Sequence, residues 1–359
     1  MTPLSPEEER RTARQTLLIG RDAQQRLHDS HVLVVGAGGL GCPALQQLVA
    51  GGIGRITLID DDVVNLTNIH RQILFGAEDV GRPKAEVAAA RVRDLQPGVD
   101  IEARCERLTA DNALALVGAA DLVLDGSDTY ATKYLVADAC EMTSTPLVWG
   151  TVLRFHGDVA LFHSGADTPD GRGVGLRDLL PSPPSDTATC ETAGVLGATT
   201  SVVGGLMATA ALGFLSKLDA PVGRVTSYDA FPPLFRTLTV GADPARPLVT
   251  HLPEAQEADA YAQWPAAVLD IREYEERLVV ELTPPPGTRL VELPFSRIHD
   301  DAHVADALRE LDAADVGVLC ALGKKSAAFA LRYEELANTC GTHLHNIDGG
   351  ARVLGSYLN

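Results

Sequence analysis

HVLVVGAGGLG at residues 31–41, with RITLID at residues 55–60, is the stretch that decides the fold. An apolar run enters a glycine-rich turn and a helix-like segment, and a second apolar run ends in Asp60. This order is typical of a nucleotide-binding βαβ unit. The glycines let the backbone approach phosphates, the helix start offers N–H groups to an anion, and Asp60 is placed to bind a ribose. The predicted nucleotide-binding glycines are Gly36, Gly38, Gly39 and Gly41.

Polar and charged residues follow that acid in DDDVVNLTNIHRQ, residues 60–72, and in GRPK, residues 81–84. A dinucleotide such as NAD or FAD needs little beyond the glycine turn and the acid. A nucleoside triphosphate carries more charge and requires cations beside it. Arg71 and Lys84 can supply these cations, and Asn68 can donate hydrogen bonds. This stretch therefore favours a triphosphate over a dinucleotide.

A third segment, DLVLDGSD at residues 121–128, is an apolar strand that ends in a loop with two carboxylates. Ligands of open α/β sheets bind beyond the carboxyl ends of the strands, and a carboxylate there suits Mg²⁺. We predict that Asp128 is the Mg²⁺ ligand. Asp125 is the competing choice, although it could instead close the strand by accepting hydrogen bonds from loop N–H groups.

The chain alternates between strand-like and helix-like segments, which predicts an α/β fold with a Rossmann-like, doubly wound and mostly parallel sheet. The segment at residues 164–189 is rich in proline and glycine and predicts a long loop. We expect a nucleotide-binding domain at residues 1–245, a linker at residues 246–263, and a smaller α/β domain at residues 264–359. Further predicted elements are helices at residues 84–96, 109–118, 132–142 and 193–218, and strands at residues 101–107, 146–149, 225–228 and 235–240.

Composition narrows the class of protein. A chain of 359 residues is long enough for about two domains. The net charge of −18 argues against nucleic acid as the partner. The sequence contains no run of 18 uninterrupted apolar residues, so no membrane span is expected. The start of the chain is polar and acidic, which is not typical of a signal peptide. Six cysteines without close spacing indicate reduced thiols, so a cytoplasmic location is expected.

A cysteine with a reactive setting occurs in VGVLCALGKKS, residues 316–326. Cys320 ends a predicted strand, and a short loop then enters a helix. Backbone N–H groups and the helix start stabilise an anionic sulfur in such a place. Lys324 and Lys325 add positive charge. The pattern predicts a thiol of lowered pKa at Cys320.

The order of these motifs resembles the ThiF/MoeB/HesA group, the bacterial relatives of ubiquitin-activating enzymes, over about residues 10–240. The resemblance implies that ATP and Mg²⁺ adenylate the C-terminal Gly-Gly of a small ubiquitin-like protein, with release of pyrophosphate. It also implies a homodimer in which Arg14 reaches the ATP site of the partner subunit. The matching segments are Arg14-Gln15, residues 36–41, Asp60, residues 68–72 with Gln72 included, residues 81–84, residues 125–128 and residues 189–197.

Residues 264–359 resemble a rhodanese domain, and such two-domain chains resemble the MoeZ-type adenylyltransferase/sulfurtransferases. The resemblance implies a persulfide on Cys320, loaded by a cysteine desulfurase or thiosulfate, that converts the adenylated carrier into a thiocarboxylate. Cys190 is the candidate for the second thiol, and a small reductant is its alternative. At two positions where rhodanese loops commonly have arginine, this chain has Ala321 and Lys325. An inactive docking or regulatory domain therefore stays open, and an NAD- or FAD-dependent oxidoreductase is the second alternative.

Many relatives in this group hold a structural zinc with two Cys-x-x-Cys pairs. By the resemblance, these pairs would lie within residues 164–180 and just after Val240. Neither region contains a cysteine, and no Cys-x-x-Cys occurs in the chain. Because tetrahedral zinc requires four ligands, we predict that this chain holds no zinc.

Overall fold

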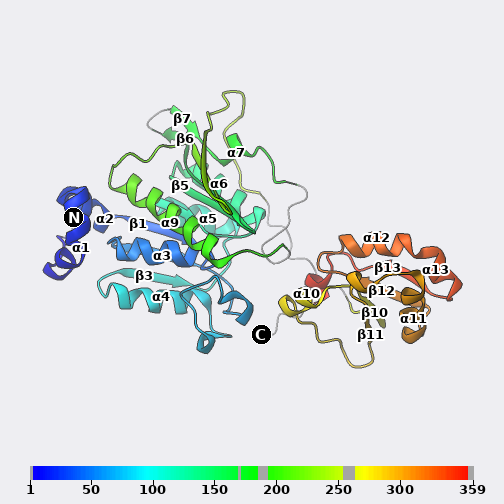
Figure 1. Ribbon diagram of the computed structural model, residues 1–359. Coiled ribbons are helices and arrows are strands. Elements are labelled where there is room, and N and C mark those ends of the chain that lie inside the picture. The colour runs from blue at the N-terminus through cyan, green and yellow to red at the C-terminus, as the bar shows by residue number, and fades with distance from the viewer. Residues whose placement is uncertain (1–2, 169–170, 185–192, 254–262, 355–359) are drawn as a thin grey trace. The chain divides into compact units, whose positions relative to one another are not determined.

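The computed structural model describes residues 3–168, 171–184, 193–253 and 263–354. The chain divides into two compact units, unit 1 at residues 1–255 and unit 2 at residues 256–359 (Figure 1). The boundary between the units falls inside the segment predicted as the linker. Each unit has its own sheet and its own core, so each is described by itself.

Unit 1 is built on one large sheet whose strands run in the order β3-β2-β1-β4-β5-β6-β8-β9, with β7 paired to β6. The first five strands are parallel, and the pairs β5–β6, β6–β8 and β8–β9 are antiparallel. The predicted Rossmann-like sheet is confirmed. The strands are β1 (His31–Val35), β2 (Arg55–Ile59), β3 (Asp100–Arg104), β4 (Leu122–Asp125), β5 (Leu147–Leu153), β6 (His156–Thr168), β7 (Gly171–Val174), β8 (Arg224–Ala230) and β9 (Pro233–Thr239).

Helices cover both faces of this sheet (Figure 1). Side chains alternate along a strand, so Val32 and Val34 of β1 enter one core while Leu33 and Val35 enter the other. This is why β1 is apolar at successive positions. The first core packs α3 (Gly41–Ala50), α4 (Lys84–Leu95) and α9 (Gly197–Leu215); the second packs α5 (Ala110–Gly118) and α6 (Tyr130–Thr143). Two further helices, α1 (Pro6–Ile19) and α2 (Arg21–Asp29), precede β1.

The prediction of one long loop over residues 164–189 is wrong for its first half. There β6 continues through Thr168, and β7 and the short helix α7 (Leu176–Leu179) follow. Hydrogen bonds hold this segment to α6, because Arg177 forms an ion pair with Asp138 and the hydroxyl of Tyr134 donates to the carbonyl of Leu180 at 2.7 Å. Glycines and prolines here mark bends between short elements.

Helix α9 is long and apolar enough, by length and composition alone, to cross a membrane. In unit 1 it packs against α3, β5 and β6, and its Val203, Met207 and Ala211 are fully buried. These contacts place one face of α9 against the core of unit 1.

Unit 2 contains a four-stranded parallel sheet in the order β11-β10-β12-β13. Its strands are β10 (Ala267–Asp270), β11 (Arg289–Glu292), β12 (Asp315–Leu319) and β13 (His343–Asn346). Its helices are α10 (Tyr274–Val279), α11 (Asp301–Leu311), α12 (Lys324–Arg332), α13 (Glu334–Thr339) and α14 (Ala351–Leu354). Arg272 is buried just after β10 and forms an ion pair with Asp270 at 2.8 Å, which fixes the end of this central strand.

Candidate active site

The glycine turn joins β1 to α3, and two of its glycines are required, Gly41 by packing and Gly36 by its φ of +89°. A Cβ on Gly41 would lie 1.9 Å from the carbonyl oxygen of Gly36, and one on Gly36 would lie 3.1 Å from that of Gly126. Gly38 differs, because a Cβ there would meet nothing closer than 3.9 Å. The protein's own packing therefore does not require glycine at Gly38, and its absent side chain leaves room for a ligand beside the turn.

Asp60 follows β2 and is fixed against this turn. Its Oδ2 accepts a hydrogen bond of 2.7 Å from the N–H of Ala37, and its Oδ1 accepts one of 2.9 Å from the N–H of Asp62. Burial raises the pKa of Asp60, and the nearby Lys84 ammonium partly offsets this. The carboxylate is thus oriented at the carboxyl end of β2, where the sequence predicts ribose binding.

Lys84 is a buried cation at the start of α4. Only 5% of the residue is exposed, and its Nζ lies 2.7 Å from Oδ2 of Asp62. Burial lowers the pKa of Lys84, but the carboxylates of Asp60, Asp62 and Asp128 outweigh burial and raise it. The side chain therefore keeps its positive charge within an acidic cluster.

Arg71, Gln72 and Asn68 lie on the segment that packs over the glycine turn. Asn68 ends a 3-10 helix, and its carbonyl accepts the N–H groups of both Arg71 and Gln72. The Cγ of Arg71 is 3.5 Å from where a Cβ on Gly39 would lie. Gln72 is buried and its Oε1 has no hydrogen-bond partner. An unpaired buried amide oxygen beside the turn fits a site that receives a polar ligand.

The two carboxylates after β4 differ in setting. Asp125 is fully buried, where it accepts hydrogen bonds from the N–H and Oγ of Ser127 and lies 3.4 Å from Nζ of Lys133. Asp128 is exposed and close enough to Lys84 to raise its pKa. Asp125 thus closes the strand, while Asp128 is the carboxylate open to a cation.

Arg14 is not brought to this chain's own glycine turn. Its neighbour Gln15 donates a hydrogen bond of 2.7 Å to the carbonyl of Gly51, just past the end of α3, whereas the turn precedes the start of α3. The ten residues of this helix separate the two places by roughly 15 Å. Arg14 is exposed on α1, and Cys190 lies outside the described residues.

In unit 2, Cys320 follows β12 and is 2% exposed. Its Sγ accepts hydrogen bonds from the N–H of Gly323 at 3.1 Å and from the N–H and Oγ of Ser326 at 3.3 and 3.1 Å. These donors form a pocket suited to an anionic sulfur at the start of α12. Lys325, which stands where an arginine is common, is instead paired with Glu276 at 3.0 Å. Ser326, the last residue of the stretch that resembles a rhodanese loop, was given no role of its own from the sequence, and it supplies two of these three hydrogen bonds.

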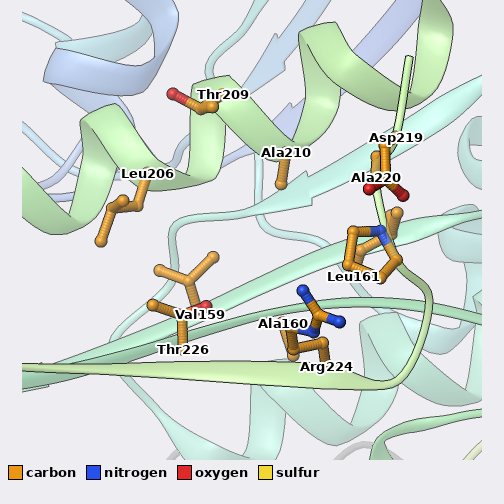
Figure 2. Close-up of a pocket in the computed structure, with 11 residues that line it drawn as sticks. Val159, Ala160, Leu161, Leu206, Thr209, Ala210, Asp219, Ala220, Arg224 and Thr226 are labelled. Carbon is orange, nitrogen blue, oxygen red and sulfur yellow. The ribbon is translucent and has the colours of Figure 1, made fainter. Parts of the chain in front are cut away.

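A hollow of unit 1 lies away from the glycine turn. It measures about 190 Å³ and lies between α9 and the strands β6 and β8. Figure 2 shows Leu206 and Ala210 of α9 over Val159 of β6, with Asp219 and Arg224 at one end. None of the predicted site residues lines it.

Known proteins resemble the chain over the region built on this turn. The model of the ThiF family matches residues 12–248. The sulfur carrier protein adenylyltransferase of Thermus thermophilus is 44% identical over 261 residues, which are 71% of this chain and 96% of that protein. The adenylyltransferase and sulfurtransferase MOCS3-1 of Drosophila pseudoobscura pseudoobscura is 32% identical over 361 residues, which are 90% of this chain and 79% of that protein.

A solved structure shares the fold of unit 1. The crystal structure of Escherichia coli MccB with ATP aligns to 67% of this chain and 74% of its own, with a TM-score of 0.57 and 19% sequence identity. Because the family model matches most of unit 1 and a 44% identical relative is covered almost in full, the chain belongs to the ThiF family.

Proposed function

We propose that this chain adenylates the C-terminal Gly-Gly carboxylate of a small ubiquitin-like sulfur-carrier protein with ATP, and then converts it into a thiocarboxylate through Cys320. The observation that carries the first half is the buried Lys84 ammonium among Asp60, Asp62 and Asp128 beside an open glycine turn. The sulfur carrier protein adenylyltransferase of Thermus thermophilus supports the same reaction class.

In the adenylation step, a carrier carboxylate oxygen attacks the α-phosphorus of ATP, and the bond to pyrophosphate breaks. Arg71 and Lys84 offset the charge of the phosphates, while the N–H groups of the glycine turn bind phosphate oxygens. Asp60 binds the ribose, and Asn68 and Gln72 contact the nucleotide beside the glycine turn. Asp128 would hold Mg²⁺, which supplies charge neutralisation at the phosphates. The product is an acyl-adenylate with AMP as its leaving group.

In the sulfur step, the terminal sulfur of a Cys320 persulfide attacks the acyl carbon and AMP leaves. The acyl disulfide formed on Cys320 is then cleaved by a second thiol, which releases the thiocarboxylate and leaves a disulfide. Gly323 and Ser326 stabilise the sulfur anion. We propose Cys190 for the second thiol, with a small reductant as its alternative, and a cysteine desulfurase or thiosulfate as the sulfur donor.

We propose that the active form is a homodimer, supported by one face of α1. Arg14, Leu17 and Leu18 are three and four residues apart, so they share a side of this helix. Leu17 and Leu18 are each 85% exposed, and Arg14 has no ion pair within the described residues. Leu17 and Leu18 are apolar side chains that suit an interface with a second copy of the chain. Arg14 lies beside them and is distant from its own glycine turn, so in such a dimer it would enter the partner's ATP site.

ATP–pyrophosphate exchange with Mg²⁺ and candidate carriers ending in Gly-Gly tests the first half. Mass spectrometry of the carrier after addition of thiosulfate tests the second half, since one oxygen is replaced by sulfur. We expect exchange in both the unaltered protein and Cys320→Ala, with the sulfur gained only in the former. Sulfur gained equally in both would demote unit 2 to docking or regulation. If no carrier supports exchange, the dinucleotide alternative returns.

A further inference from the structure

A second group of ligand-type side chains lies in unit 2, at the amino-terminal ends of β12 and β13. Asp315 begins β12, and its register partner across the parallel pair is His343; Gly317 is paired in the same way with His345. Side chains two residues apart on a strand share a face, so both histidines point to the side on which Asp315 lies. Gly317 has no side chain to separate His345 from the aspartate.

Three donor atoms converge at this place. Oδ1 of Asp315 lies 3.0 Å from Nδ1 of His343 and 3.1 Å from Nδ1 of His345. These ligand atoms all lie within 4.8 Å of one another. The side chains of Asp315 and His343 are 65% and 69% exposed, so the group is open to water on its outer side.

We propose that Asp315, His343 and His345 form a binding site for a divalent first-row transition metal, of which Zn²⁺ is the natural probe. Imidazole nitrogens with one carboxylate oxygen are a ligand set for Zn²⁺, Co²⁺, Ni²⁺ and Cu²⁺. Ligands bound at about 2.1 Å stand roughly 3.0 to 3.4 Å apart when their bonds meet at 90° to 110°. The two distances from Oδ1 of Asp315 fall at the lower end of that range, the two imidazole nitrogens lie within 4.8 Å of each other, and the open side admits water as the remaining ligands.

The site is independent of the sulfur chemistry. It contains no cysteine and so differs from the Cys-x-x-Cys zinc site of related chains, but it departs from the prediction from sequence that this chain holds no zinc. Asp315 and Cys320 lie at opposite ends of β12, and five residues of strand span roughly 16 Å. The metal would instead join the edge strand β13 to β12 through side chains as well as backbone. Because a metal that binds only the folded state stabilises it, we expect Zn²⁺ to stabilise unit 2 without entering the reaction.

The test is equilibrium dialysis of the metal-free full chain against micromolar Zn²⁺ with a phosphine reductant, without ATP or Mg²⁺, followed by elemental analysis. The variant pair is His343→Ala with His345→Ala. The matched control is His299→Ala with His303→Ala, which removes two histidines of unit 2 whose rings also lie close, at 5.6 Å. We expect the control to retain all bound zinc and the variant to lose one equivalent per chain.

Single substitution of the carboxylate provides a second measurement that does not remove the imidazoles. Asp315→Asn keeps the size of the side chain, and it should weaken zinc binding by at least about tenfold, because even outer-shell changes cost that much. Equal zinc content and equal affinity in the unaltered chain, Asp315→Asn and both histidine pairs would overturn the proposal. Far-UV circular dichroism checks that each variant is folded.

Discussion

The Nη2 of Arg246 lies 2.7 Å from Oε2 of Glu141, and this ion pair ties the chain after β9 to α6. Nε of the same guanidinium lies 3.0 Å from Oδ1 of Asp178 in α7. Asp178 also accepts hydrogen bonds from Arg172 and from the N–H of Asp243. These segments are the two in which the resemblance to the ThiF/MoeB/HesA group would place zinc cysteines, and neither contains a cysteine. Here a buried set of charges links them.

Removal of Arg246 should therefore destabilise unit 1 strongly. In Arg246→Ala, Glu141 and Asp178 would stay buried without their cation, a situation that costs about 3 to 5 kcal/mol in the free energy of unfolding. The control is Arg55→Ala, whose partner Asp100 is exposed and 3.7 Å away, with an expected loss below about 1 kcal/mol. Urea unfolding, followed by the fluorescence of Trp149 in a Trp264→Phe background, measures the free energy of unfolding of unit 1 in both variants. Equal losses in the two variants would contradict this account.

The same cluster predicts how unit 1 responds to acid. Burial raises the pKa of Asp178, but hydrogen bonds from Arg246, Gly175 and Asp243 outweigh burial and lower it to about 2. Because the folded pKa lies below the unfolded value, Asp178 stabilises the fold above about pH 4 and loses this contribution as the pH falls toward 2. Asp178→Asn should be less stable near pH 6 and fall less steeply between pH 4 and 2. The exposed Asp100→Asn should keep the original slope.

Two buried lysines of unit 1 should give opposite phenotypes. Lys84→Met removes the cation beside the glycine turn, so ATP–pyrophosphate exchange should fall about 100-fold or more. Lys133→Met instead removes the cation beside Oδ2 of the fully buried Asp125 and the hydrogen bond to the carbonyl of Gly150, which costs about 3 to 5 kcal/mol of stability. Exchange assays at low temperature and urea unfolding separate the effects. Undiminished exchange in Lys84→Met would remove Lys84 from the site.

Residues whose role depends on local order could be predicted from the sequence. Asp60 directly follows β2, Asp128 lies in the loop after β4, and the turn from Gly36 to Gly41 stands between a strand and a helix, so secondary structure alone brings them to one edge of the sheet. Arg246 could not be predicted in this way. Its partner Glu141 is 105 positions away, and no periodic pattern connects them. The ion pair between Arg246 and Glu141 depends on tertiary packing.

The loop after β6 shows the same limit. Glycine and proline between residues 164 and 189 predict irregular chain, yet Asp178 and Arg177 find partners that fix β7 and α7. A similar reason applies to Ser326, whose Oγ lies 3.1 Å from the sulfur of Cys320 because α12 begins at Lys324. The pattern of residue types indicated the loop, and only the backbone geometry identified the donor.

Two glycines of unit 2 separate backbone strain from damage to the cysteine loop. Gly350 and Gly341 have φ values of +67° and +74°, so alanine is strained by about 1 to 2 kcal/mol at either. A Cβ on Gly350 would also lie 2.4 Å from the carbonyl oxygen of Cys320, whereas one on Gly341 meets nothing within 4 Å. Sulfur transfer should fall about 100-fold in Gly350→Ala and little in Gly341→Ala. ATP–pyrophosphate exchange should be unchanged in both; similar sulfur-transfer rates would contradict a positioning role for Gly350.

Arg14 and Lys84 should complement each other across a dimer. If Arg14 serves the partner's ATP site, Arg14→Ala and Lys84→Met are each inactive alone, but a mixed dimer contains one site with an unaltered Lys84 and an unaltered partner Arg14. Co-expression of the two variants, each with its own affinity tag, would give mixed dimers in which about half of the sites are intact. Exchange activity of the doubly purified sample should then approach half that of the unaltered protein.

The control for this experiment uses a pair that cannot complement. Asp128 and Lys84 belong to the same proposed site of one chain. A mixed dimer of Asp128→Asn and Lys84→Met therefore has no intact site and should stay inactive. Light scattering establishes that the samples are dimers. Activity in the Asp128 and Lys84 mixture, or none in the Arg14 and Lys84 mixture, would mean that Arg14 does not act in trans, and the exposed face of α1 formed by Arg14, Leu17 and Leu18 would then require another partner.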